Sequence, residues 1–135
     1  MKQVFVDNNV FLRFLTADEP KKFQACKKLF TQAVEGGISL ITSEMIIAEL
    51  IWTLLSYYKV SKTEVVEKII AILNTPNLYI PNKDLISETL LVFERKDVDY
   101  IDAYNAVFMR YQKVEEIYSY DRNFDVIEGI KRIEP

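Results

Sequence analysis

Short apolar runs without polar alternation recur along this chain, and they constrain its fold more than any other feature. Four of them, QVFVD, ISLIT, EIYSYD and IKRIEP, are typical of strands buried on both faces, as strands of parallel sheets are. A fifth run, NLYIP, is a weaker candidate. Segments of helical periodicity lie between these runs. The alternation predicts a three-layer α/β/α fold around a central, mostly parallel sheet of four to five strands.

Helix-start signals precede the periodic segments. They are Asp18 ahead of Pro20, Ser43 ahead of EMIIAEL, Ser61 with Glu64 as a capping box, Asn82 ahead of KDLISETLLVF, and Asp99 ahead of YIDAYNAVFMRY. We therefore expect a helix to begin at Pro20 and at the start of each of the other segments.

Length and composition favour a single domain over residues 1–135, because three glycines and four prolines leave no segment that resembles a linker. The single cysteine, Cys26, cannot form an internal disulfide and fits a buried apolar role in a reducing compartment. No signal-peptide pattern opens the sequence, and no apolar stretch approaches the roughly 20 residues of a membrane span. We expect a cytoplasmic protein that does not bind a membrane.

The residue types also limit the chemistry. There is no histidine, which removes the commonest general base, and one cysteine cannot build a zinc site. Any metal would therefore have oxygen ligands. The formal charge of −3 argues against a simple basic nucleic-acid binder.

Two acids stand where predicted strands end. Asp7 follows the first apolar run and Asp121 ends EIYSYD, so in a parallel sheet both carboxylates reach the same edge, where open α/β sheets bind ligands. Each acid alone could instead be a helix N-cap.

Two further acids lie on predicted helices. Glu49 is in MIIAELIWTLL, a segment that is apolar nearly all round, so we expect a buried carboxylate whose nearest cation in sequence, Lys59, is beyond the i+4 position. A distant side chain or a metal would compensate it. Asp102 lies beside Ala103, Ala106 and Val107, and it is either a first-turn acid or a fourth inward carboxylate, with Asp99 as the helix cap.

Four converging acids without cations would repel one another, and at least one would take up a proton. Hard divalent cations resolve this repulsion, and all-oxygen ligation favours Mg²⁺ or Mn²⁺. Apart from the four acids the chain is close to neutral. A metal would therefore be what attracts phosphate.

The order and setting of these acids resemble the PIN-domain family, and in particular its VapC-type toxin ribonucleases. The resemblance covers nearly the whole chain: VFVDNNVFLRFL is similar to the family's opening strand, and TSEMIIAELIWTL, DYIDAYNA and YSYDRNFD to its second, third and fourth motifs. It implies a PIN-like nuclease fold over residues 1–135, and it implies these roles: metal ligands and catalytic acids Asp7, Glu49, Asp102 and Asp121, an additional acid Asp125, and supporting residues Asn9 and Ser43. The sequence departs at Asn8, where the family commonly has Thr or Ser.

The resemblance implies cleavage of RNA phosphodiesters that depends on Mg²⁺ or Mn²⁺, often by a toxin that a VapB-type antitoxin holds inactive. The expected chemistry is a metal that polarises a phosphate oxygen and lowers the pKa of a bound water, which attacks phosphorus in line. Arg13, Arg110 and Arg122 are near enough in sequence to these motifs to contact RNA backbone, or they are simply solvated charges.

The segment ELIWTLLSYYKV carries more aromatic surface than one core face needs, with Trp52, Tyr57 and Tyr58 on or just after its helix. We expect part of this surface, with the following helix, to form a groove for an antitoxin helix or for a second copy in a homodimer. Ordinary packing is the alternative.

Other functions were weighed against the same residues. A haloacid-dehalogenase-type phosphatase needs an acid two positions after its Asp nucleophile, where this chain has Asn9. The DRNFD segment opens like a calcium-binding EF-hand loop, but Val126 replaces its glycine and Arg132 stands where its bidentate Glu belongs. A housekeeping RNA-processing nuclease and a catalytically silent PIN-like interaction module remain as alternatives.

Overall fold

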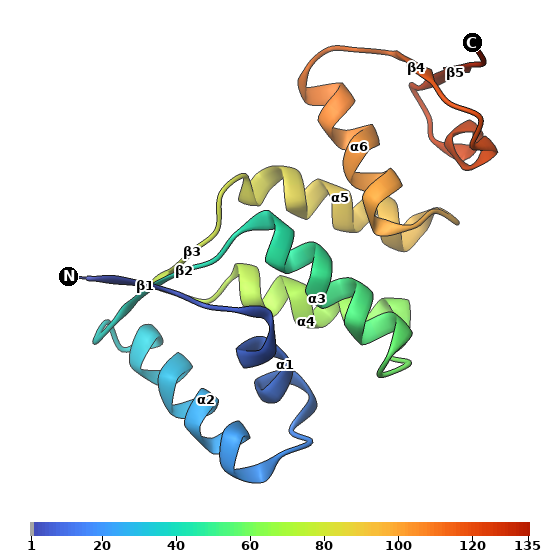
Figure 1. Ribbon diagram of the computed structural model, residues 1–135. Coiled ribbons are helices and arrows are strands. Elements are labelled where there is room, and N and C mark those ends of the chain that lie inside the picture. Colours follow the sequence, from blue (N-terminus) through green and yellow to red (C-terminus); the bar gives the residue numbers. More distant parts are fainter. Residues whose placement is uncertain (1) are drawn as a thin grey trace. The chain divides into compact units, whose positions relative to one another are not determined.

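The computed structural model describes residues 2–135, which form two compact units (Figure 1). The first unit extends to Pro81 and the second begins at Asn82. We describe each unit by itself.

The first unit is an α/β arrangement of three short strands and four helices. Its elements are β1 (Gln3–Phe5), α1 (Asn8–Thr16), α2 (Pro20–Val34), β2 (Ser39–Ile41), α3 (Glu44–Ser56), α4 (Lys62–Leu73) and β3 (Leu78–Tyr79). The strands pair in parallel in the order β1-β2-β3, with Val4 opposite Leu40 and Leu40 opposite Leu78. Two helices connect each pair of successive strands (Figure 1), because parallel strands need a long crossover connection.

The second unit is built from two helices and a small parallel ladder. Its elements are α5 (Lys83–Arg95), α6 (Tyr100–Tyr111), β4 (Glu116–Tyr118), a 3₁₀ helix, η1 (Arg122–Val126), and β5 (Lys131–Ile133). Strands β4 and β5 pair in parallel, with Ile117 opposite Arg132. The sharp return from η1 to β5 therefore brings the last strand alongside the strand that ends before Asp121.

Each unit has its own apolar core. In the first unit Leu40, Ile47, Leu50, Leu54 and Ile69 are fully buried. A second layer is aromatic, with the rings of Phe11 and Phe14 at 5.5 and 5.0 Å from that of Phe30. In the second unit the buried faces of α5 and α6 meet around Ile86, Leu90, Phe93, Ala103 and Val107.

The structure confirms all five predicted strands and their parallel pairing. Hydrogen-bonded pairing joins three strands in the first unit and two in the second, whereas the prediction placed all of them in one sheet. Ser43, Ser61 and Asp99 are confirmed as N-caps, since each side chain accepts a hydrogen bond from the backbone N–H three residues later.

The helices predicted at Pro20 and after Asn82 are confirmed, but the side chains of Asp18 and Asn82 do not cap them. Helix α2 begins at Pro20 but its N-cap is Glu19, because the carboxylate of Asp18 accepts hydrogen bonds from Arg13 and Tyr58 instead. Asn82 does precede α5, yet it has a left-handed backbone (φ 55°) and its side chain does not cap the helix. No helix within residues 2–135 is long and apolar enough to cross a membrane.

Thr42 fixes the end of β1 next to Asp7. Its side chain is buried at 1% exposure, and its hydroxyl donates a hydrogen bond of 2.8 Å to the carbonyl oxygen of Val6. The N–H of Val6 donates to the carbonyl oxygen of Ile41, also at 2.8 Å. The residue before Asp7 is therefore held by two hydrogen bonds from the neighbouring strand.

We predict that Thr42→Val lowers the free energy of unfolding by about 1–2 kcal/mol, because the shape is kept but the carbonyl oxygen of Val6 loses its buried donor. The matched control is Thr53→Val, which removes a hydroxyl that bonds the carbonyl oxygen of Glu49 at the exposed surface of α3. We expect that control to cost less than about 0.5 kcal/mol. Urea unfolding of both variants measures the difference, and equal effects would contradict the role given to Thr42.

Candidate functional site

Three acids come together in the second unit, and local backbone geometry places each of them. Asp99 is the N-cap of α6, and its carboxylate accepts a hydrogen bond of 2.8 Å from the N–H of Asp102 in the first turn. Asp121 follows β4 and caps η1 by accepting a hydrogen bond of 2.9 Å from the N–H of Asn123. The N–H of Asp121 donates to the hydroxyl of Ser119 at 2.9 Å. Helix and strand ends thus bring Asp99, Asp102 and Asp121 into one place.

These acids interact electrostatically at Asp102. Partial burial of this carboxyl and then the negative charges of Asp99 and Asp121 raise its pKa from 3.8 to about 6. Hydrogen bonds from the protonated carboxyl to the other two contribute in the same direction. The raised pKa of Asp102 has the direction expected for converging acids, but the convergence of the four predicted acids, on which that expectation rests, stays a prediction.

The first unit carries the other two predicted acids. Asp7 is exposed directly after β1, at the N-cap position of α1 with extended backbone (φ −84°, ψ 163°), and its side chain makes no cap hydrogen bond. Its carboxylate is therefore not engaged by the helix that it precedes, which was the alternative considered for it.

The expectation that Glu49 is buried is wrong for this unit. Helix α3 buries one face through Ile47, Leu50, Ile51 and Leu54, while Glu49 is exposed on the opposite face. Met45 and Trp52, which precede and follow it by about one turn, are 79% and 69% exposed. Apolar residues on the exposed face made the helix look buried all round in sequence. No buried unpaired charge therefore has to be compensated at Glu49.

The four predicted ligands are divided between the two units, with Asp7 and Glu49 in the first and Asp102 and Asp121 in the second. The convergence of all four stays a prediction. In the part of the chain that the structure describes, no three Asp, Glu or Cys side chains are gathered in a geometry that would hold a metal ion. The donor chemistry nevertheless fits a hard divalent cation, since every candidate is a carboxylate.

The predicted supporting residues belong to the first unit, as Asp7 and Glu49 do. Asn9 is exposed in the first turn of α1, and the hydroxyl of Ser43 accepts a hydrogen bond of 3.2 Å from the N–H of Ile46 as the cap of α3. Asn8, where the sequence departs from the family pattern, has a buried side-chain oxygen with no hydrogen-bond partner among residues 2–135. This oxygen is an acceptor next to Asp7 that a donor from a ligand or water would satisfy.

Asp125, the predicted additional acid, is engaged in an ion pair. Its carboxylate accepts hydrogen bonds of 2.9 and 3.4 Å from the guanidinium of Arg132, which lowers its pKa. In sequence, Arg132 stands out only as a mismatch to a calcium-binding loop. The register between β4 and β5 brings the two residues together, and a local motif carries no signal for it.

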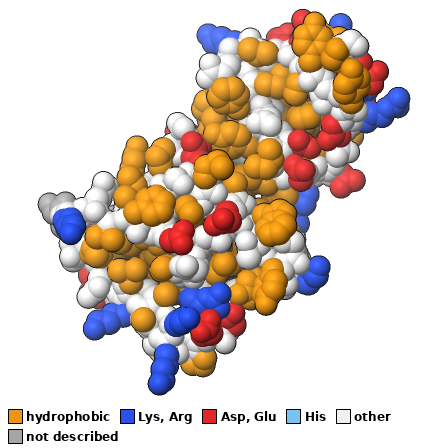
Figure 2. All heavy atoms as spheres, viewed as in Figure 1, with side chains coloured by type: hydrophobic (Ala, Val, Ile, Leu, Met, Phe, Trp, Pro, Cys, Tyr) orange, Lys and Arg blue, Asp and Glu red, His pale blue; other side chains and the backbone are white. Residues whose placement is uncertain are grey.

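The three predicted RNA-contacting arginines differ in their surroundings. Arg13 is only 22% exposed and is paired with Asp18 at 2.8 Å and Glu19 at 2.7 Å, while Arg110 and Arg122 are exposed. On the face shown in Figure 2, Lys and Arg side chains are scattered among acidic and apolar ones and do not form a continuous basic stripe. A contact between any of them and RNA stays a prediction.

Comparisons with known proteins cover almost all of the chain. A model of the PIN domain matches residues 4–130. Over 130 residues, the chain is 25% identical to a VapC ribonuclease of Aquifex aeolicus, covering 96% of this chain and 95% of that protein. It is also 25% identical over 146 residues to ribonuclease VapC13 of Mycobacterium tuberculosis, with 96% and 98% covered. Among solved structures, Mycobacterium tuberculosis VapC20, titled a sarcin-ricin loop cleaving toxin, aligns over 99% of this chain and 100% of its own at 17% identity, with a TM-score of 0.42.

The raised pKa of Asp102 predicts how stability depends on pH without metal. The native carboxyl, with a pKa of about 6, binds its proton more tightly than the unfolded one at 3.8. The free energy of unfolding should therefore fall as pH rises from about 4 to about 6 and stay low above that. Asp102→Asn should remove this part of the decline and raise the stability of the metal-free protein at pH 7 by ~1 kcal/mol, a figure reduced because Asp102 is partly exposed.

Urea unfolding of both proteins in EDTA at several pH values between 4 and 7 measures this effect. If the parent and Asp102→Asn curves ran parallel across that range, repulsion at Asp102 would not be a source of instability.

Proposed function

The chain belongs to the PIN domain family, and on that premise we propose that it is a ribonuclease of the VapC toxin kind that depends on a divalent cation. The observation that supports the proposal in this molecule is the meeting of Asp102 with Asp99 and Asp121. Partial burial and two neighbouring carboxylates together raise the pKa of Asp102, and a place where negative charge is gathered in this way favours the binding of a cation. Two curated relatives matched over nearly their whole length are named ribonucleases.

We propose Mg²⁺ or Mn²⁺ as the cofactor, held by Asp7, Glu49, Asp102 and Asp121. When bound, such a cation supplies Lewis acidity at the scissile phosphate and a lowered pKa for water at the site. The residues of the chain act around it. The Asp99 cap fixes the backbone of Asp102 in the first turn of α6, and the hydrogen bond from the N–H of Asn123 orients the carboxylate of Asp121.

The acids also determine the pH range in which the site binds a cation. Asp102 holds its proton up to a pH of about 6 when no cation is present, so protons and cations compete for the same carboxyl. We expect cation binding to weaken below that pH.

We predict that Asp7→Asn and Asp102→Asn each lower the rate of RNA cleavage in Mn²⁺ by at least about 100-fold, because each removes a charged ligand. Asp97→Asn is the matched control, since Asp97 is an exposed acid outside the four motifs. We expect this control to cleave like the parent. Cleavage of a labelled RNA, with EDTA as a second control and thermal melts of each variant, measures the effect.

A parent rate that persisted in Asp7→Asn would exclude the assigned site. Inactivity of the well-folded parent on every RNA tested in Mn²⁺ and Mg²⁺ would favour the silent interaction module. Cleavage without growth arrest on expression would favour the housekeeping nuclease.

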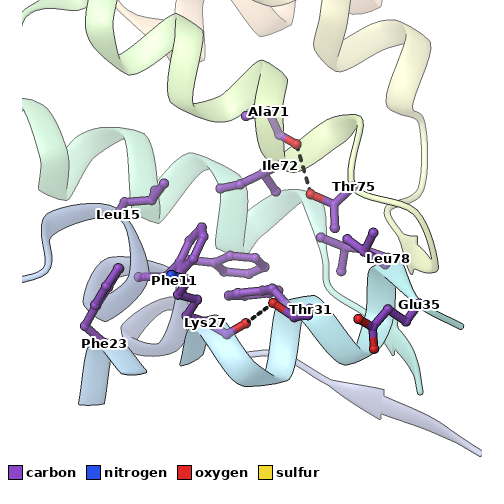
Figure 3. Close-up of a pocket in the computed structure, with 13 residues that line it drawn as sticks. Phe11, Leu15, Phe23, Lys27, Thr31, Glu35, Ala71, Ile72, Thr75 and Leu78 are labelled. Atoms are coloured by element: carbon purple, nitrogen blue, oxygen red, sulfur yellow. Dashed lines mark hydrogen bonds between the residues drawn. The ribbon is translucent and has the colours of Figure 1, made fainter. Parts of the chain in front are cut away.

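We also propose a docking site for an antitoxin helix in the first unit. A pocket of about 540 Å³ lies among α1, α2 and α4, and its lining is largely apolar (Figure 3). The lining residues are Phe11, Phe14, Leu15, Phe23, Lys27, Phe30, Thr31, Val34, Glu35, Ala71, Ile72, Thr75 and Leu78. This volume accommodates a few apolar side chains of one helix face.

The charged residues at this pocket suggest the orientation of its occupant. Lys27 and Glu35 both belong to α2 and stand eight positions apart, which is about 12 Å along a helix. An amphipathic helix that lies along the pocket would place an acid near Lys27 and a base near Glu35. This pocket is a different surface from the one predicted at Trp52, Tyr57 and Tyr58.

We predict that Thr31→Arg weakens binding of a small antitoxin encoded beside this protein by at least about 10-fold, because the new side chain fills an apolar pocket with charge. The matched control is Gln32→Arg, which adds the same charge to the next exposed position of α2, outside the lining. Calorimetric titration of both variants, checked by thermal melts, measures the difference. Equal affinities for the two variants would exclude the pocket as the antitoxin site.

The homodimer is a separate proposal. Trp52 and Tyr57 are 69% and 76% exposed at α3, and Met45 is 79% exposed on the same helix. These side chains offer apolar surface that a second copy would cover. Light scattering of the purified chain tests this, and a monomer at micromolar concentration would exclude a stable dimer.

A further inference from the structure

We propose that Arg132 is a positioning residue that holds the segment 119–125 from both ends and thereby fixes the carboxylate of Asp121 for cation binding. The inference rests on the proposed function, since Asp121 is taken as a ligand. It assigns a role to a residue outside the four motifs, and it gives Asp125 the role of a counter-ion in place of that of a ligand.

Arg132 contacts the two ends of this segment with different nitrogens. Its Nη1 donates a hydrogen bond of 3.1 Å to the carbonyl oxygen of Ser119, at the end of β4. Its Nε and Nη2 donate to the two oxygens of Asp125 in η1, at 2.9 and 3.4 Å. One planar guanidinium therefore spans the turn that carries Asp121.

The turn is also joined internally to these anchor points. The N–H of Asp121 donates to the hydroxyl of Ser119, and the carboxylate of Asp121 accepts from the N–H of Asn123. The N–H of Ser119 itself donates to the carbonyl oxygen of Ile133 at 3.1 Å, next to Arg132 in β5. A displacement of Ser119 or Asp125 would be transmitted to Asp121 through these bonds.

The setting of Arg132 indicates a fixed side chain. It is 12% exposed, whereas Asp125 is 49% exposed and its third partner, Glu134, is 54% exposed. The guanidinium is thus the best shielded member of the network. An ammonium group has no rigid fork, so lysine at this position could keep the charge but could not bridge both anchors in the same geometry.

The charge of Arg132 and its proposed positioning role predict opposite changes in Mn²⁺ affinity when Arg132 is replaced. By charge alone, loss of a cation near acids should strengthen the binding of Mn²⁺, and it would also release Asp125 as a possible ligand. If Arg132 acts by holding the segment, its loss should weaken binding, because Asp121 is no longer held against Asp102. The sign of the change therefore separates the two explanations.

The experiment measures Mn²⁺ binding to the full chain by isothermal titration calorimetry, without RNA. We expect Arg132→Met to raise the dissociation constant about 10-fold or more, within the range found when residues that orient metal ligands are replaced. Arg132→Lys should show most of the same loss. Glu134→Gln is the matched control, since it removes one ion pair of Arg132 but leaves both anchor contacts, and its affinity should equal that of the parent.

A second measurement follows the segment itself. Hydrogen exchange of the Asp121 and Asn123 amides, both hydrogen-bonded in the structure, should accelerate in Arg132→Met and Arg132→Lys but not in Glu134→Gln. If Arg132→Met does not melt cooperatively, Asp125→Asn replaces it for this measurement and should accelerate the same amides, because it releases one anchor.

Each outcome decides the proposal. Weaker Mn²⁺ binding together with faster exchange in the two Arg132 variants supports it. Unchanged or tighter Mn²⁺ binding in Arg132→Met overturns it, and so does unchanged exchange. If the parent chain does not bind Mn²⁺ at all, the proposed function is overturned and the positioning role with it. If the parent cleaves RNA and the Arg132 variants bind Mn²⁺ as the parent does, only the positioning role is overturned.

Discussion

Repulsion among carboxylates at Asp102 is the interaction on which the candidate site depends. Asp99 and Asp121 each have a structural task as the cap of a helix, so neither can move away without freeing a backbone N–H. Asp102 must therefore remain beside two acids, and partial burial of its carboxyl together with their charges raises its pKa to about 6. The fold maintains this unfavourable arrangement because the caps, the packing of α5 on α6 and the β4–β5 ladder support it from several sides. The carboxylates of Asp99 and Asp121 thus stabilise the unit as helix caps and destabilise it by repelling Asp102.

Much of this could be predicted from the sequence because the signals are local. Apolar runs of three to five residues identified all five strands, and Ser43, Ser61 and Asp99 identified three helix starts, since a cap and its partner are only three residues apart. The position of Asp121 after a strand and that of Asp102 in a first helical turn followed from the same reasoning. A raised pKa was expected from repulsion among the acids, whereas partial burial of the Asp102 carboxyl is its largest cause.

What the sequence could not provide depends on contacts between distant residues. Aspartate is a common N-cap residue, but the carboxylate of Asp18 binds Arg13 and the hydroxyl of Tyr58, forty positions later, and does not cap the helix. Glu49 was expected to be buried because apolar residues surround it in sequence, yet Met45 and Trp52 share its exposed face. Apolar composition alone does not show which face of α3 packs. The pairing of Arg132 with Asp125 needs the register of β4 against β5, which no motif encodes.

Arg13 in the first unit and Arg132 in the second form similar ion-pair networks. Each guanidinium is well shielded, binds two carboxylates, and connects a loop to another element. At Arg13 the segment held is the turn between α1 and α2, which carries none of the predicted metal ligands. At Arg132 the segment held carries Asp121, whose charge raises the pKa of Asp102. The two ion-pair networks differ in the loop that each one holds. The position of Asp121 in the loop at Arg132, and not the strength of the ion pair, is the reason for which we assign Arg132 to the proposed site.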